Sequence, residues 1–286
     1  MEVANLKFSG HESFHCRPFW LKKGFDFVKS EQQFTDKAGI DLGVGKNMVG
    51  SIRFWLKAFD IVDDNNELTE LASRIFNDEN GWDPFLEDEA TLWLLHYKLS
   101  SKQYSTVYHL IFSDLRKIRP EFTKNHFVSK VNEIDAKQSD KIIAKDFSVF
   151  TRTYFAKASK DKEESFSGLF TDLGLLAEVG KDSQENTLYH INNVKQSSIP
   201  WQIILFCILE NDNYGKSISF NSLFTDSKGV GNIFAFNQEE LENKLIEISE
   251  CEKDIIYKND AGVKELQFKT NKPSGLDILN RYYNEN

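Results

Sequence analysis

Four residues near the amino terminus, His11, Glu12, His15 and Cys16, carry side chains capable of metal or acid–base chemistry. His11 and His15 are four residues apart, so they would share one face of an α-helix, and imidazoles placed in this way bind zinc. Pro18 argues against an uninterrupted helix from His11, because proline lacks the backbone N–H and clashes with the preceding turn. A metal site here is therefore the less favoured interpretation.

The favoured interpretation is that His11, Glu12 and Arg17 form a polar network that fixes the amino-terminal segment, or that Arg17 binds a ligand anion. A hydrolase would need these residues to converge with His96 or His109 in one pocket. We expect no catalytic residues, no metal and no cofactor. A metal-dependent hydrolase that uses His11, Glu12 and His15 remains the last alternative.

A second candidate is the glycine-containing segment 43–47, which reads Gly-Val-Gly-Lys-Asn. A phosphate-binding loop of the pattern G-x-x-x-x-G-K-[ST] would need Gly at position 40 and Ser or Thr at position 47, where the chain has Ile40 and Asn47. The glycines are better explained as a turn with positive φ angles that leads into a helix. That turn would place Lys46 and Asn47 at the helix amino terminus, where backbone N–H groups favour a phosphate.

The helix predicted after this turn has an apolar face, because six apolar residues recur at helical spacing: Met48, Val49, Ile52, Trp55, Leu56 and Phe59. Polar residues fall mostly on its other faces. We expect Asn47 and Arg53 to read base edges, while Lys46 and Lys57 position the DNA backbone. The predicted DNA-binding residues are Lys46, Asn47, Ser51, Arg53 and Lys57.

The elements around this helix have the order expected of a winged helix. Residues 61–62 and 68–69 favour extended chain, and the Asp and Asn residues at 63–66 favour a turn. Helix, turn, helix and hairpin in succession predict a winged helix, whose second helix can enter a DNA groove. A winged helix that packs against protein instead is the main alternative.

The same order of elements recurs twice more along the chain. In the middle region, residues 175–179 and 187–191 would pair as a hairpin after two helices. In the last region, residues 254–258 and 263–269 would also pair as a hairpin after two helices. The predicted fold is mainly α with small β-hairpins (α+β), as tandem winged-helix-like domains. The predicted divisions are 1–81 (amino-terminal domain), 82–120 (helical connector), 121–197 (middle domain) and 198–286 (carboxy-terminal domain).

Charge is distributed unevenly over the 286 residues, whose net charge is −9. Residues 1–59 hold nine basic against six acidic residues, and residues 98–130 hold seven against two. Residues 60–91 instead hold eleven acids and one arginine. Because screening limits attraction to a Debye length of about 8 Å, a basic face can bind DNA on an acidic protein. Solvated helix faces would explain the same pattern.

The three cysteines are far apart in sequence and form no C-x-x-C pair, so we predict neither a disulfide framework nor a cysteine zinc site. Residues 1–5 lack the basic-then-apolar order of a signal peptide. The longest apolar run, 203–209, is shorter than the roughly 20 residues of a membrane helix. We expect a cytoplasmic protein with no membrane partner.

Two motifs resemble a known family. Residues 8–14 (Phe-Ser-Gly-His-Glu-Ser-Phe), followed by Arg17 and residues 20–23, are similar to the opening of the family called domain of unknown function 4007. Residues 42–49, followed by 52–55, are similar to that family as well. The resemblance implies a bacterial protein that is often encoded beside sulfur-transfer genes in DNA phosphorothioation and phage-defence islands. It implies no catalytic residues, and the family carries other residues where this chain has His15 and Cys16.

Together these observations predict a non-catalytic DNA-binding or adaptor protein of a bacterial DNA-modification or phage-defence system. Its predicted partners are DNA and proteins of that complex, and its oligomeric state is open. The alternatives are an autonomous winged-helix transcription regulator, a protein–protein scaffold without DNA binding, and the metal-dependent hydrolase described above.

Overall fold

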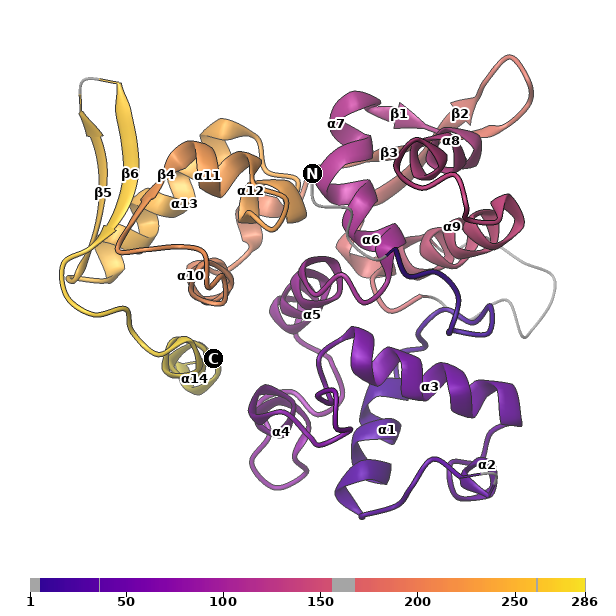
Figure 1. The fold of residues 1–286 in the computed structure, drawn as a ribbon. Helices are drawn as coiled ribbons and strands as arrows, with labels where there is room; N and C mark the ends of the chain where they lie inside the picture. The colour runs from indigo at the N-terminus through magenta and orange to yellow at the C-terminus, as the bar shows by residue number, and fades with distance from the viewer. Residues whose placement is uncertain (1–5, 36, 156–167, 261, 286) are drawn as a thin grey trace. The chain divides into compact units, whose positions relative to one another are not determined.

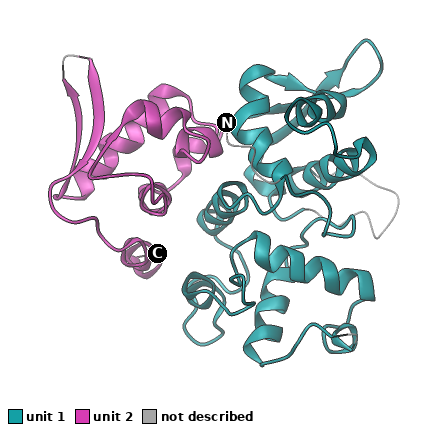
Figure 2. Ribbon diagram, viewed as in Figure 1, with its two compact units in different colours: residues 1–192 teal, residues 193–286 magenta. Residues whose placement is uncertain are grey.

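The computed structural model describes residues 6–35, 37–155, 168–260 and 262–285 (Figure 1). The chain forms two compact units, residues 1–192 and residues 193–286, shown in teal and magenta in Figure 2. It is a mixed α+β chain, and the described residues form two small antiparallel sheets of three strands each. The finer boundaries at residues 81, 120 and 197 stay predictions.

The first unit opens with helices that surround α3 and closes with a helix pair and a sheet. Its helical elements are α1 (Trp20–Lys29), α2 (Ala38–Asp41), α3 (Lys46–Ala58), α4 (Glu70–Phe76), α5 (Glu89–Ser101), α6 (Thr106–Leu110), the π-helical turn η1 (Ile111–Leu115), α7 (Arg116–Ile118), α8 (Lys124–Ile134), α9 (Asp140–Tyr154) and the 3-10 turn η2 (Thr171–Leu173). Its strands are β1 (Glu121–Phe122), β2 (Leu176–Lys181) and β3 (Thr187–Ile191).

Helix α3 packs closely on α1. A Cβ atom added to Gly24 of α1 would lie 2.8 Å from Leu56 and 3.0 Å from Ile52, both on α3. Glycine therefore permits the two helices to approach at this point. The hairpin predicted after α3 is reduced to one antiparallel bridge, between Val62 and Leu68.

The amino-terminal helix begins only after the motif of residues 8–14. Ser9 and Ser13 are candidate caps by residue type, but both have positive φ angles, of 69° and 72°. Helix α1 begins at Trp20, two residues after Pro18.

In the sheet of the first unit, the predicted pairing of β2 with β3 is confirmed, with Ala177 opposite His190. The two-residue strand β1 joins the other edge of β3, so the strand order is β1-β3-β2. Helix α8 begins with a capping box, in which Thr123 accepts from the backbone of His126 and the His126 side chain accepts from the backbone of Thr123.

The core of the first unit is rich in aromatic rings. Tyr108, Phe112, Phe150, Tyr154 and Phe170 are all almost fully buried and contact one another. Two buried hydrogen bonds hold helices within this cluster. His96 Nδ1 lies 2.7 Å from the Tyr154 hydroxyl, and the Tyr108 hydroxyl lies 2.9 Å from Thr153 Oγ1. Buried polar groups paired in this way define which helices pack together.

The second unit has the same kind of sheet. Its elements are η3 (Gln196–Ser198), α10 (Trp201–Leu209), β4 (Ser217–Ser219), α11 (Phe220–Thr225), α12 (Val230–Ile233), α13 (Gln238–Cys251), β5 (Ile255–Asp260), β6 (Val263–Phe268) and α14 (Gly275–Glu285). The predicted pairing of β5 with β6 is confirmed, and the strand order is β4-β6-β5. Helix α10 is buried from Gln202 to Ile208 and packs against α13 and α14. Among the described residues, no helix combines the length and apolar character required to cross a bilayer.

Candidate nucleic-acid interface

The outer face of α3 carries the cations predicted from the sequence. Lys46, Gly50, Arg53 and Lys57 recur at intervals of four, three and four residues and therefore form one stripe along the helix. Lys46, Gly50 and Arg53 are exposed, and Lys57 is half-buried with its ammonium group 3.3 Å from the carbonyl oxygen of Asp64. The helix contains no acidic residue. The stripe therefore presents positive charge to solvent along two turns or more.

The amino terminus of α3 is open. Its N-cap residue, Gly45, offers no side chain to the first-turn N–H groups, and no acid lies in the first turn. Gly43 has a φ of 62°, as predicted, whereas Gly45 has a φ of −66° and extended backbone, so the prediction of a positive φ was wrong for Gly45. Asn47 is exposed at this end. The helix dipole and the N–H groups here favour an anion.

Ser51 differs from the other predicted DNA-binding residues. It is fully buried, and its hydroxyl oxygen has no hydrogen-bond partner among the described residues. Around the helix axis, position 51 lies between the exposed Gly50 and the buried Ile52. Its side chain faces the core and not the cationic stripe. The prediction that Ser51 contacts DNA was therefore wrong, because its side chain is inaccessible.

A hollow of about 380 Å³, lined by both polar and apolar side chains, adjoins the stripe. Arg53 lies on its wall with four amide side chains, those of Gln32, Gln33, Asn65 and Asn66. The Oδ1 atom of Asn66 is shielded from solvent and has no hydrogen-bond partner among the described residues. Amides and a guanidinium group are the side chains that hydrogen-bond to base edges.

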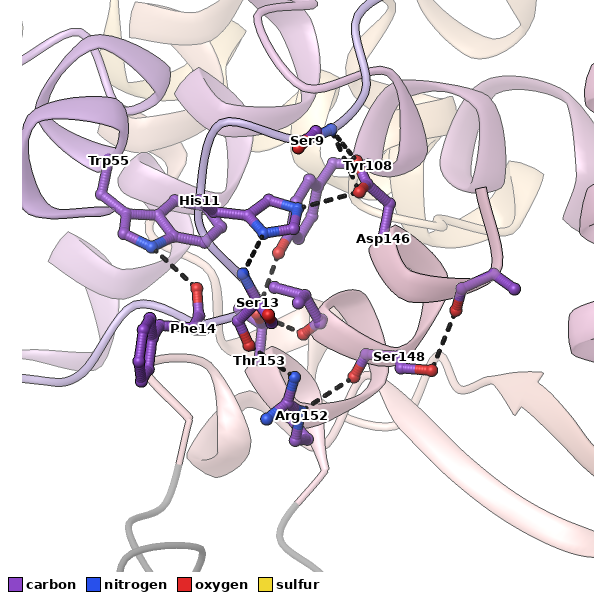
Figure 3. Close-up of polar contacts among 12 residues, drawn as sticks. Ser9, His11, Ser13, Phe14, Trp55, Tyr108, Asp146, Ser148, Arg152 and Thr153 are labelled. Atoms are coloured by element: carbon purple, nitrogen blue, oxygen red, sulfur yellow. Dashed lines mark hydrogen bonds and ion pairs between the residues drawn. The ribbon is translucent and has the colours of Figure 1, made fainter. Parts of the chain in front are cut away.

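A strained loop, residues 9–13, lies between α3 and α9 (Figure 3). Three of its non-glycine residues have positive φ angles: Ser9 (69°), Glu12 (48°) and Ser13 (72°), and Gly10 has a φ of 95°. Such angles cost about 1 kcal/mol or more each in residues other than glycine. The surrounding contacts must therefore fix this loop.

Asp146 of α9 supplies the main contact to the loop. Its carboxylate accepts hydrogen bonds from the backbone N–H of Ser9 at 3.1 and 3.0 Å. His11 Nε2 lies 3.1 Å from Asp146 Oδ1, and both side chains are only 1% exposed. The N–H direction of Nε2 is off the line to the oxygen, so this contact is mainly electrostatic. Figure 3 shows the imidazole directed toward the carboxylate.

The other side of His11 contacts α3. Its ring stacks on Trp55 with centroids 5.9 Å apart, and it meets Phe54 edge to face at 5.4 Å. Trp55 Nε1 donates to the carbonyl oxygen of Phe14 at 3.2 Å (Figure 3). On the α9 side, Arg152 donates to the carbonyl oxygen of Ser13 at 2.7 Å. His11 thus joins two helices that are about ninety residues apart in sequence.

Of the predicted network of His11, Glu12 and Arg17, the structure brings only His11 to Asp146. Glu12 is exposed, with its Cγ 3.8 Å from where a Cβ on Gly50 of α3 would lie. Arg17 stacks its guanidinium group over the Trp20 ring at 5.2 Å. The partner of His11 was missed because Asp146 lies far away in sequence and no local pattern marks it.

The geometry does not suit the zinc interpretation. The spacing of His11, Glu12 and His15 is that of H-E-x-x-H, which binds zinc when the segment is helical. Here the segment is not helical, and Glu12 has a left-handed φ. Burial raises the pKa of the Cys16 thiol, which disfavours the thiolate that a metal would require. In the described part of the chain, no three His, Cys, Asp or Glu side chains cluster as metal ligands would.

His96 and His109 have partners elsewhere in the fold. His96 bonds to Tyr154 in the aromatic core, and His109 Nδ1 lies 3.0 Å from the carbonyl oxygen of Ser100. Both contacts tie helices or turns together, as expected for packed or capping histidines.

Two solved structures are similar to the whole chain. One, described as "Magnesium ion-bound SspB crystal structure", has a TM-score of 0.83 and 27% sequence identity, covering 99% of this chain and 90% of the other. The second, described as "SspB crystal structure", has a TM-score of 0.81 and 26% identity, covering 99% and 91%. No curated protein matches the chain. The family described as Protein of unknown function (DUF4007) matches residues 8–283, nearly the full length. The chain therefore belongs to this family.

Proposed function

We propose that this protein binds DNA through the outer face of α3 and acts as a non-catalytic adaptor in a DNA-modification or defence assembly. The observation that carries the proposal is the stripe of Lys46, Arg53 and Lys57 on a helix without acidic residues. Had these side chains been buried, the proposal would have failed. In this proposal Arg53, which lines the hollow with four amide side chains, and Asn47 read the bases.

The order of strands and helices supports winged-helix units. Residues 121–191 contain a strand, two helices and a hairpin in succession, and their three strands form a sheet of order β1-β3-β2. The strands of residues 201–268 have the equivalent order β4-β6-β5. In both units the first strand joins the second strand of the hairpin. The segment around α3 has the helices of a winged helix, but in place of the wing it has only the bridge between Val62 and Leu68.

The adaptor half of the proposal rests on the last unit. Its helix α13 is acidic, and Glu242 on it accepts hydrogen bonds from Lys264 at 2.6 Å, Tyr257 at 3.1 Å and Asn259 at 2.9 Å. The bond from Lys264 lowers the pKa of Glu242 below its usual value. Because this lysine of the hairpin is neutralised by its own helix, this unit suits a protein partner better than DNA.

The test is fluorescence anisotropy of a labelled duplex over a series of salt concentrations. Phosphate contacts release counterions, so the affinity should fall linearly with salt on a log–log plot. Arg53→Glu should weaken binding about tenfold or more, since it removes one contact and adds repulsion. Arg74→Glu is the matched control, an exposed arginine on the neighbouring helix α4. A flat salt response that Arg53→Glu leaves unchanged would remove DNA from the proposal and leave a protein scaffold.

An autonomous transcription regulator makes a different prediction. It would form a two-fold dimer that binds half-sites about one helical turn apart. Light scattering of the purified protein separates the two cases, because a monomer at every concentration tested excludes the paired-site regulator.

A second candidate function is magnesium-dependent chemistry on DNA, favoured by the magnesium ion in the description of one similar structure. Magnesium commonly uses one or two carboxylates, waters and substrate phosphates. We assign no residues of this chain to it, since the buried carboxylate beside His11, that of Asp146, already accepts hydrogen bonds from Ser9. Incubation of supercoiled plasmid with the protein, with and without Mg²⁺, tests it: relaxation that requires Mg²⁺ would replace the non-catalytic proposal.

A further inference from the structure

The outer face of α9 repeats the pattern of α3. Lys141, Lys145, Ser148 and Arg152 recur at intervals of four, three and four residues, the same spacing as in the α3 stripe. The first three are exposed and Arg152 is half-buried. The opposite side of α9 is buried through Ile143, Phe147 and Phe150.

Charge on this face is positive. Asp140, at the start of α9, accepts a hydrogen bond from Asn132 at 2.8 Å. The remaining acid of the helix, Asp146, points inward and is 1% exposed. The exposed acid Asp140 therefore lies at the first residue of α9, about 100° around the helix from Lys141, and no other acid of this helix faces solvent.

The two cationic faces meet at the strained loop. Glu12 lies against Gly50, in the middle of the α3 stripe, and its neighbour Ser13 accepts a hydrogen bond from Arg152, in the α9 stripe. Figure 3 shows Arg152 directed to this loop. Because Asp146 and His11 fix the loop from within, the separation of the two faces is fixed as well.

We propose that α9 is a second DNA-contacting helix, and that α3 and α9 hold the sugar-phosphate backbone of one duplex together. Lys141 and Lys145 neutralise phosphates, and Arg152 positions the loop between the helices. The inference rests on the proposed function, which assigns DNA contact to α3.

Charge spacing favours a duplex over an acidic protein. Lys141 and Lys145 are separated by about 6 Å along the helix axis, from the rise of 1.5 Å per residue. Each strand of duplex DNA carries a phosphate about every 3.4 Å of its axis, a regular array that two such lysines can contact without matching a particular base sequence. An acidic protein surface would have to match this spacing residue by residue.

The experiment uses the full chain and a labelled duplex of about two helical turns, measured by anisotropy over a salt series. The variant Lys141→Gln/Lys145→Gln should bind about tenfold more weakly, and the slope of log affinity against log salt should shrink by about 2. The control Lys253→Gln/Lys258→Gln removes the same charge from exposed positions in residues 193–286 and should change affinity less than twofold. Circular dichroism and thermal unfolding confirm that each variant is folded.

A parallel variant on α3, Lys46→Gln/Arg53→Gln, separates the two proposals. If the α3 variant weakens binding and the α9 variant does not, the proposal that α9 contacts DNA is overturned and the proposed function stands. If only the α9 variant weakens binding, contact by α3 is wrong. If the control weakens binding as much as the α9 variant, the effect comes from net charge, and the proposal that the α9 surface contacts DNA is overturned. If the unaltered protein does not bind DNA, both proposals fail.

Discussion

His11 Nε2 lies 3.1 Å from Asp146 Oδ1, and the two side chains are buried together although 135 positions separate them in the sequence. Ser13 donates its backbone N–H to His11 Nδ1 at 3.3 Å, so Nδ1 is an acceptor and the ring proton is on Nε2, on the side of the carboxylate but off the direct line to its oxygen. The motif at the amino terminus is therefore held by a residue of α9, and its conformation depends on the folding of α9.

Asp146→Ala should be strongly destabilising. It leaves the Ser9 N–H and His11 without their buried partner, and each buried polar group left unsatisfied costs about 1–3 kcal/mol. Urea unfolding followed by circular dichroism measures the change. Ser148→Ala, at an exposed position of the same helix, is the control and should cost less than about 1 kcal/mol. A loss below that value for Asp146→Ala would show that the pair does not hold the loop.

Gly10→Ala should cost more stability than Gly43→Ala. Both glycines have positive φ angles, of 95° and 62°, which alone cost an alanine about 1–2 kcal/mol. At Gly10 the new Cβ would also lie 2.7 Å from a ring carbon of Phe54, whereas at Gly43 it would meet nothing within 4 Å. We expect about 2–4 kcal/mol for Gly10→Ala and about 1 kcal/mol for Gly43→Ala. Equal losses in thermal unfolding would contradict the close contact with Phe54.

Stability should fall in acid partly through Asp60, which follows α3. Burial acts to raise the pKa of Asp60, but the ammonium groups of Lys98 and Lys102 outweigh burial and lower that pKa below its usual value. A lowered pKa in the folded state stabilises the protein above the unfolded value of about 3.9, and this stability is lost as the pH falls further.

Asp60→Asn should therefore lower the free energy of unfolding at pH 7 by about 1 kcal/mol and flatten its decline below about pH 4. Unfolding in urea at a series of pH values measures both effects. An unchanged decline in the variant would remove Asp60 from the acid response.

Glu12→Gln should strengthen DNA binding, if α3 is the contact surface. Glu12 is exposed beside Gly50, within the cationic stripe, and its charge repels phosphates over a Debye length of about 8 Å. We expect an affinity about two- to threefold higher at low salt, with the difference shrinking as salt is added. Glu250→Gln, at an exposed position of α13, is the control. Weaker binding by Glu12→Gln would mean that this carboxylate contributes to the complex.

The elements that the sequence predicted well are those with a local pattern. The helical spacing of apolar residues identified α3. Two segments with strand-forming residues, joined by turn-forming residues, identified the β2–β3 and β5–β6 pairs. Strands β1 and β4 have two and three residues, too few to show a period, and were missed. They are strands only because a hairpin formed elsewhere offers them an edge.

The candidate site was predictable in part, for the same reason. Lys46, Asn47 and Arg53 are exposed because the apolar residues of α3 determine which side faces the core. Whether they contact DNA stays a prediction. Asp146 was unpredictable, because its role comes from tertiary packing and its neighbours in sequence give no sign of it. Asn66, in the hollow beside Arg53, was missed because it looked like turn chemistry alone.

The close approach at Gly24 has a consequence for how members of this family diverge. Any side chain at position 24 would press on the ends of the buried Leu56 and Ile52 side chains, so either these side chains would repack or α3 would move away from α1. A replacement that moves α3 would change the position and direction of the helix axis without changing any charge. If α3 contacts DNA as proposed, two relatives with identical cations would then prefer different nucleic-acid geometries, and the residue that distinguishes them would never touch the DNA.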